Sequence, residues 1–193
     1  GDQGALIEAG SIDIQLNQHN NTFKTIEALD NVAVNLPSGD SANQTITAQS
    51  FSMFTDPGIS GQNDSEVIRA EFGGPVKYQE SQDGNNQDHV DRLIQSEFLR
   101  ADIQPGFLGI RQATFERDVK LFSGDIIGEA STAAYDVEAG TFGLHALNLS
   151  SIKPRIVDKR GTLEATNITL DFAGPNVSAI GNIRGVLDSP VAA

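Results

Sequence analysis

Apolar and polar residues alternate with a period of two through most of the chain. Residues 12–16, Ile-Asp-Ile-Gln-Leu, show the pattern, and residues 32–36 and 168–172 repeat it. Successive side chains of a strand point to opposite faces, so each run has one apolar and one polar face. Only residues 89–101 approach helical spacing, and their place in the repeat described next favours a strand. The sequence therefore predicts an all-β protein.

Five copies of one unit become visible when the chain is divided at its turn signals. Each copy begins with an aliphatic, a polar and a small residue, followed by two mostly polar residues and usually an apolar one. The five copies begin at Ile7, Ile46, Ile94, Ile127 and Leu163. A second pattern follows a turn in each copy, at Ile26, Ile68, Ile110 and Val177, with a weak counterpart at Phe142. A unit with one apolar face cannot bury that face alone, so the units must pack on one another.

Short polar or glycine-containing pairs interrupt the apolar stretches within the units. Asp30-Asn31, Gly73-Gly74 and Gly181-Asn182 are predicted to be turns or bulges at which the chain bends and re-enters the same sheet. Residues 57–64 and 81–88 have loop composition. A sandwich, a closed barrel and a stacked roll would each bury the apolar faces. The even spacing of strands and the lack of a covering helix favour the stacked roll.

The charge and residue composition exclude several classes of binding partner and site. The formal net charge of −13 argues against nucleic acid and anionic membranes, and its simplest role is solubility. The absence of cysteine excludes disulfides, thiolate zinc sites and a cysteine nucleophile. No apolar run is long enough for a transmembrane helix. The chain starts at Gly1 without a signal peptide, which suggests a processed or excised fragment.

The sequence nominates no catalytic site, cofactor or metal ion. His19, His89 and His145 are scattered and are expected in exposed loops. The acidic pairs Asp136/Glu138 and Asp56/Asp64 match no calcium-binding pattern, and no nucleophile-elbow or phosphate-loop motif occurs.

Three arginines lie close together in the third unit, at Arg92, Arg100 and Arg111. They could meet lipid phosphates at the mouth of a groove. Pairing with some of the 26 acidic residues is the favoured interpretation.

Residues 124–141, with their Tyr135-Asp136 pair and Gly140 turn, resemble the repeat of the OstA-like family, and residues 161–170 and 179–183 look like further copies. This family comprises the lipopolysaccharide-transport bridge proteins LptC and LptA and the N-terminal domain of LptD. The resemblance is a pattern of degenerate repeats and extends from about Ile7 to Val186.

The resemblance implies a β-jellyroll shaped like a folded taco, in which two antiparallel sheets enclose a groove for lipid acyl chains. Such proteins dock edge to edge with other Lpt jellyrolls and carry lipopolysaccharide across the periplasm towards the outer membrane. LptC-like proteins have an N-terminal membrane anchor to the inner membrane, and LptA-like proteins do not; the sequence leaves both open. Residues 1–188 are expected to form one such domain, and 189–193 the start of a linker or tail.

A lipid groove needs apolar walls, and the inner faces of the predicted strands supply candidates. The predicted groove residues are Ile12, Ile14, Leu16, Ile26, Val34, Phe51, Phe72, Val76, Phe115, Val119, Leu121, Leu144, Leu147, Ile168, Leu170, Phe172, Ile180 and Ile183. Burial of acyl CH₂ groups at about 0.8 kcal/mol each would give affinity without chemistry. The alternative is that these side chains only pack on one another.

Two other classes of function remain open. A structural β-solenoid or adhesin segment would stack its repeats without a lipid ligand, although solenoid repeats usually have tighter periods than the roughly 33 to 48 residues found here. A carbohydrate-active jellyroll enzyme would need a convergent polar pocket, which no residues nominate. Unpaired terminal strands predict head-to-tail self-association at high concentration.

Overall fold

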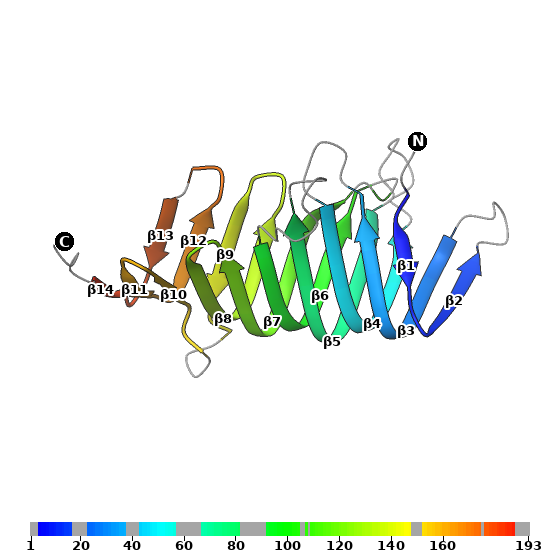
Figure 1. Cartoon of the computed structure of the whole chain (residues 1–193), viewed down its shortest axis with the longest axis horizontal. Coiled ribbons are helices and arrows are strands. Elements are labelled where there is room, and N and C mark those ends of the chain that lie inside the picture. The colour runs from blue at the N-terminus through cyan, green and yellow to red at the C-terminus, as the bar shows by residue number, and fades with distance from the viewer. Residues whose placement is uncertain are drawn as a thin grey trace.

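A computed structural model describes residues 4–16, 23–37, 43–56, 67–81, 92–104, 107, 109–147, 152–174 and 176–187. Within these residues, fourteen strands form one antiparallel sheet that is folded over on itself (Figure 1). The strands are β1 Leu6–Glu8, β2 Ser11–Leu16, β3 Phe23–Leu36, β4 Asn43–Asp56, β5 Val67–Ser81, β6 Arg92–Ile103, β7 Ile110–Ser123, β8 Ile126–Asp136, β9 Thr141–His145, β10 Arg155–Asp158, β11 Gly161–Glu164, β12 Asn167–Asp171, β13 Asn176–Ile180 and β14 Arg184–Leu187.

The long strands β3 to β8 each contribute to two layers, because each bends near its middle. The pairing register shifts at the bend, for example between Leu29 and Val32 in β3 and between Gly73 and Val76 in β5. We call the line of bends the crease and the opposite strand ends the rim. Layer A contains β1, β10, β11 and β14 with one half of each long strand; layer B contains β2, β9, β12 and β13 with the other halves.

The crease is built by backbone in the left-handed region, which turns an extended chain sharply. Asp30 and Asn31 have φ of 66° and 54°, Gly74 has 88°, and Gly181 and Asn182 have 77° and 48°. The predicted bends at these three places are therefore confirmed. A further bend at Arg117-Asp118, with φ of 64° and 47°, was not predicted, because the pair contains neither the glycine nor the asparagine that marked the other bends.

Pairs of short strands continue the crease to both ends of the sheet. Between β1 and β2, the Gly10 N–H donates to the Asp30 carbonyl at 2.7 Å. Between β11 and β12, the Thr166 N–H donates to the Gly181 carbonyl, also at 2.7 Å. Each short pair is thus one bent strand that is broken at the crease, and the fold keeps two layers along its whole length.

The sequence repeats correspond to equivalent circuits of this fold. Each unit starts in layer A and crosses the crease into layer B. The strand that follows crosses the crease in the opposite direction and returns the chain to layer A. The predicted start Ile127 is one residue early: it is 42% exposed, and Gly128 holds the buried inner position. A glycine stands there because a Cβ would lie 3.2 Å from Leu144 Cδ1 and 3.4 Å from Leu121 Cβ.

The predicted all-β fold, a β-jellyroll folded like a taco, is confirmed, and the two expected sheets are the two layers of one hydrogen-bonded sheet. Residues 92–101 form a strand, as predicted. The predicted tail 189–193 and the predicted loop residues 57–64 and 82–88 lie outside the described residues, and Ser81 is the last residue of β5. In the described part of the chain, no helix is long and apolar enough to cross a membrane.

Candidate functional site

The inner faces of the two layers meet in a packed apolar core at the middle of the fold. Within layer B, the ring centroids of Phe51 and Phe72 lie 4.9 Å apart, and Phe115 lies 6.2 Å from Phe142. Tyr78 of layer A reaches across, with its ring centroid 5.8 Å from that of Phe115. All five of these side chains are at most 3% exposed. The side chains of the protein therefore fill the middle of the fold themselves.

At the N-terminal end the same inner face is open. Ile12 is paired with Ala28 and Ile14 with Ile26, so both isoleucines share the inner face with buried neighbours. They are nevertheless 44% and 50% exposed, and Leu16 is 49% exposed. Among the described strands, β2 pairs only with β3, so no further strand covers these side chains. We call Ile12, Ile14 and Leu16 the N-terminal mouth.

At the C-terminal end a cavity of about 310 Å³ opens between the layers. Layer A contributes β10, β11 and β14, and layer B contributes Val177 of β13. Val177 is paired with the buried Leu170, which places it on the inner face. We call this cavity the C-terminal mouth; its lining is Ile156, Asp158, Arg160, Gly161, Thr162, Leu163, Val177, Gly185 and Leu187.

An ion pair stands at the turn between β10 and β11, where it joins the apolar lining of the C-terminal mouth. The Arg160 Nη2 lies 2.6 Å from Asp158 Oδ2, and the Arg160 backbone N–H donates to Asp158 Oδ1 at 2.8 Å. The hydrogen bonds from Arg160 lower the pKa of Asp158, and the same pairing raises the pKa of Arg160. The mouth therefore has a fixed charge pair beside an apolar wall.

The predicted groove residues divide into three groups. Most are buried on the inner face: Ile26, Val34, Phe51, Phe72, Val76, Phe115, Val119, Leu121, Leu144, Ile168 and Leu170, with Phe172 partly buried against them. The second group is the N-terminal mouth. In the third group the expected inward orientation is wrong. Ile180 belongs to it, because it is paired with Asn167 on the face opposite the buried Ile168 and is 71% exposed.

Two further predictions of inward orientation also fail. Leu147 is 70% exposed and lies beyond the end of β9 on the outside of the fold, and Ile183 is 60% exposed between the crease and β14. Both residues sit outside regular strands, where the alternation of faces no longer applies. A lipid-lining role for the other groups stays a prediction.

Sequence reasoning missed several residues of the C-terminal mouth, among them Leu163, Val177 and Leu187. Val177 alternates with Ala179 and faces Leu170, so the period-two pattern across the β12–β13 pair contained the signal. Leu187 is 85% exposed and stands beside the predicted tail, so nothing in its local sequence marked it as lining.

A polar cluster is buried at the rim, midway along the row of strands. Glu80 is 2% exposed and receives hydrogen bonds from Tyr78 Oη at 2.5 Å and from Tyr135 Oη at 3.1 Å. Arg92 Nη1 donates to Glu80 Oε2 at 2.5 Å and to Tyr135 Oη at 2.7 Å. The Arg92 guanidinium carbon also lies 4.1 Å from the Phe172 ring centroid.

The electrostatics of this cluster keep both phenols neutral. Burial, followed by the charge of Glu80, raises the pKa of Tyr78 and of Tyr135 well above the ordinary value for tyrosine. For Arg92, burial acts to lower the pKa, but Tyr135 and Glu80 outweigh it and the pKa is raised. Arg92 and Glu80 are therefore a charged pair that two neutral hydroxyls complete. The favoured pairing of arginines with acids is confirmed for Arg92, and for Arg100 with Glu71 and Glu116.

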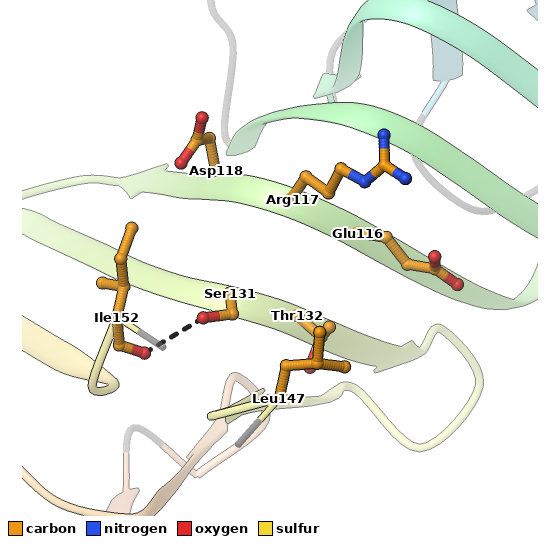
Figure 2. Close-up of a pocket in the computed structure, with 7 residues that line it drawn as sticks. All are labelled: Glu116, Arg117, Asp118, Ser131, Thr132, Leu147 and Ile152. Carbon is orange, nitrogen blue, oxygen red and sulfur yellow. Dashed lines mark hydrogen bonds between the residues drawn. The ribbon is translucent and has the colours of Figure 1, made fainter. Parts of the chain in front are cut away.

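A second hollow, of about 440 Å³, lies on the outside of the crease (Figure 2). It is lined by Glu116, Arg117, Asp118, Ser131, Thr132, Leu147 and Ile152. Ser131 Oγ donates to the Ile152 carbonyl at 3.2 Å across it. Arg117 is held against the Phe98 ring, with 4.7 Å between the guanidinium carbon and the ring centroid. Glu116, Arg117, Ser131 and Thr132, four of the polar residues that line this hollow, already bond to other groups of the protein, so the hollow is a weaker candidate than the two mouths.

Candidate metal ligands do not gather in the described part of the chain, where no group of three or more His, Asp or Glu side chains could hold an ion. His145 was expected in an exposed loop, but it lies half-buried in β9, with Nδ1 2.9 Å from Asn167 Oδ1. His19 and His89 lie outside the described residues.

Comparison with known proteins gives one solved structure to report. No protein-family model matches the sequence, and no curated protein matches it. The chain is similar to LptH of Pseudomonas aeruginosa, described as the LptA-homologous periplasmic component of the lipopolysaccharide transport device. The two are 13% identical, the match covers 97% of this chain and 96% of LptH, and the TM-score is 0.36.

Proposed function

We propose that this chain is a periplasmic lipopolysaccharide-binding bridge component. It holds acyl chains against the inner faces of the folded sheet and passes lipopolysaccharide to the next protein towards the outer membrane. The observation that carries the proposal is the apolar inner face, which continues to both ends of the fold and is open there. The choice of lipopolysaccharide among acylated lipids rests on the resemblance of the repeats.

The open ends suit acyl chains in size and chemistry. The C-terminal mouth has an apolar wall with the Asp158–Arg160 pair at its edge, and the N-terminal mouth presents Ile12, Ile14 and Leu16 in a row. Each buried CH₂ contributes about 0.8 kcal/mol, so several methylene groups suffice for binding.

Both ends also fit a partner of the same architecture. At the C-terminal end, β14 in layer A runs from crease to rim and β13 in layer B runs from rim to crease. At the N-terminal end, β1 in layer A runs from rim to crease and β2 in layer B from crease to rim. A head-to-tail stack would therefore pair β14 with β1 and β13 with β2, each antiparallel, and would join two apolar interiors.

The test of lipid binding uses a matched pair of positions on β13. A photo-reactive benzoyl-phenylalanine is placed at Val177, on the inner face, or at Ile180, on the outer face, and the protein is irradiated with purified lipopolysaccharide. We expect capture at Val177 and little at Ile180. Equal capture at the two positions, or none at either, would contradict the proposal.

The test of docking is the solution mass as a function of concentration. We expect head-to-tail oligomers that disappear in Gly185→Pro. The Val186 carbonyl points to β11, so the N–H of the neighbouring Gly185 faces the free edge of β14, and proline removes this donor. A monomeric mass at all concentrations would contradict the docking.

The alternative, a structural repeat segment without a lipid ligand, is favoured by the packed aromatic middle of the fold. The two proposals differ in the Val177 experiment, because a purely structural stack captures no lipid at the inner position. Docking alone does not separate them, since both predict stacked copies.

A further inference from the structure

The rim cluster joins the two layers, and only some of its contacts do so. Tyr78, Glu80 and Arg92 belong to the layer A halves of β5 and β6, whereas Tyr135 belongs to the layer B half of β8. The Arg92–Glu80 ion pair is thus internal to layer A. The polar contacts that cross between layers are the two hydrogen bonds of the Tyr135 hydroxyl and the stacking of Arg92 on Phe172. The Tyr78 ring also crosses, with its centroid 6.3 Å from that of Tyr135 and 5.8 Å from that of Phe115, and these ring contacts do not depend on a hydroxyl.

A second polar contact crosses at the rim nearby. Gln44 of layer A, 3% exposed, accepts a hydrogen bond from the Ile110 N–H of layer B at 2.7 Å. Gln44 is paired directly with Glu80, which in turn is paired with Arg92. Three adjacent strands of layer A therefore reach across to layer B along one stretch of rim.

Burying apolar side chains at this rim would cost less free energy than burying the polar groups found there. Removing a carboxylate from water is unfavourable unless it is fully paired, and replacing a buried ion pair by apolar residues is often neutral or stabilising. Glu80 stands at an inward position in line with Val76 and Tyr78, where an aliphatic residue would fit the pattern. The polar contacts thus hold the two layers together at the rim, and water can bond the same polar groups when the layers separate.

We propose that Tyr135, with Glu80, Arg92 and Phe172, is a latch that holds the rim shut in the middle of the fold, and that its opening separates the layers to admit acyl chains. This inference rests on the proposed function: in the closed state aromatic side chains fill the middle and acyl chains reach only the two mouths. With the latch open, an acyl chain extends inwards from a mouth between the layers.

The first test needs no lipid and uses a matched pair of variants. Tyr135→Phe removes the hydroxyl that crosses the layers but keeps the ring contacts. Tyr78→Phe removes a hydroxyl that bonds the same Glu80 carboxylate but stays within layer A. The amides to compare lie near the rim, in the layer A half of β5 and the layer B half of β8. We expect their hydrogen exchange to become about tenfold faster in Tyr135→Phe and to change much less in Tyr78→Phe.

Amides beside the crease, at Val76 and Val119, are the internal reference, because a general loss of stability would accelerate them too. Equal acceleration in the two variants, or acceleration at the crease as large as at the rim, would overturn the latch. If Tyr135→Phe does not fold, Phe172→Leu removes the stacking of Arg92 across the layers and takes its place.

The second test adds purified lipopolysaccharide. With benzoyl-phenylalanine at Phe115, in the middle, or at Val177, at the mouth, we expect Tyr135→Phe to increase capture at Phe115 severalfold and to leave capture at Val177 unchanged. Capture at Val177 with no change at Phe115 would refute the latch but keep lipid binding. If no position captures lipid while the exchange result holds, the proposed function fails and the rim closure stands.

Discussion

The middle and the two ends of this folded sheet have the same alternating sequence but differ in what covers their inner faces. In the middle, Phe115 is fully buried between layers that continue on both sides. At the N-terminal end, Ile14 lies on the same inner face and is half exposed. The difference teaches that strand alternation fixes the face of a side chain, while burial depends on its neighbours in the stack.

The difference in packing between the middle and the N-terminal end is tested most strongly by truncating one large side chain in each region. Phe115→Ala should lower the free energy of unfolding by about 3–5 kcal/mol, because it leaves a cavity in a packed core. Ile14→Ala should lower it by about 1 kcal/mol or less, since solvent already reaches that side chain. Urea unfolding measures both. Equal losses would mean that the N-terminal mouth is packed in solution.

Charge pairs give the next largest contrast. Arg92→Leu should destabilise the fold by about 3 kcal/mol, because it leaves the buried Glu80 carboxylate without its cation. Arg100→Leu should cost less than about 1 kcal/mol, since its pairs with Glu71 and Glu116 are solvent exposed. The same unfolding assay decides. A small effect of Arg92→Leu would show that water reaches Glu80 and that the rim is open on average.

The crease allows a smaller comparison between the regions. An added Cβ would lie 2.7 Å from Gln49 Cβ at Gly74, in the middle, and 2.8 Å from Thr166 Oγ1 at Gly181, near the end; both glycines have positive φ. Gly74→Ala should cost about 2 kcal/mol, because strained backbone and the clash fall in the packed part of the sheet. Gly181→Ala should cost less, since exposed end strands can yield locally. Thermal unfolding of the two variants tests the order, and the reverse order would contradict it.

The smallest effect at neutral pH, and a specific one, concerns the two tyrosines. They are the only tyrosines of the chain, and both belong to the rim cluster. Their raised pKa means that the neutral phenols contribute stability that is present below about pH 10 and lost as the pH rises further. Tyrosinate absorbance should therefore appear at higher pH in the folded chain than in urea. Identical titration curves would contradict the buried cluster.

The sequence predicted the fold because its signals were local. Alternation identified the strands, and Asn31, Gly74 and Asn182 marked the crease, since these residue types tolerate positive φ. Arg117-Asp118 escaped prediction because it contains neither glycine nor asparagine. The inward Glu80 lies at a position where alternation predicts an apolar residue, so its burial depends on partners that are distant in sequence. The exposure of Ile12 and Leu187 follows from their place at the ends, which no local pattern encodes.

The central claim is that the open ends of the inner face bind acyl chains, and methyl NMR tests it most directly. Isoleucine, leucine and valine methyl groups are labelled, and purified lipopolysaccharide is added. We expect intermolecular contacts and chemical-shift changes at Ile14 and Val177, on the inner face, and none at Ile180, on the outer face. Shifts confined to Ile180 and other outer methyl groups, or no shifts at all, would contradict it.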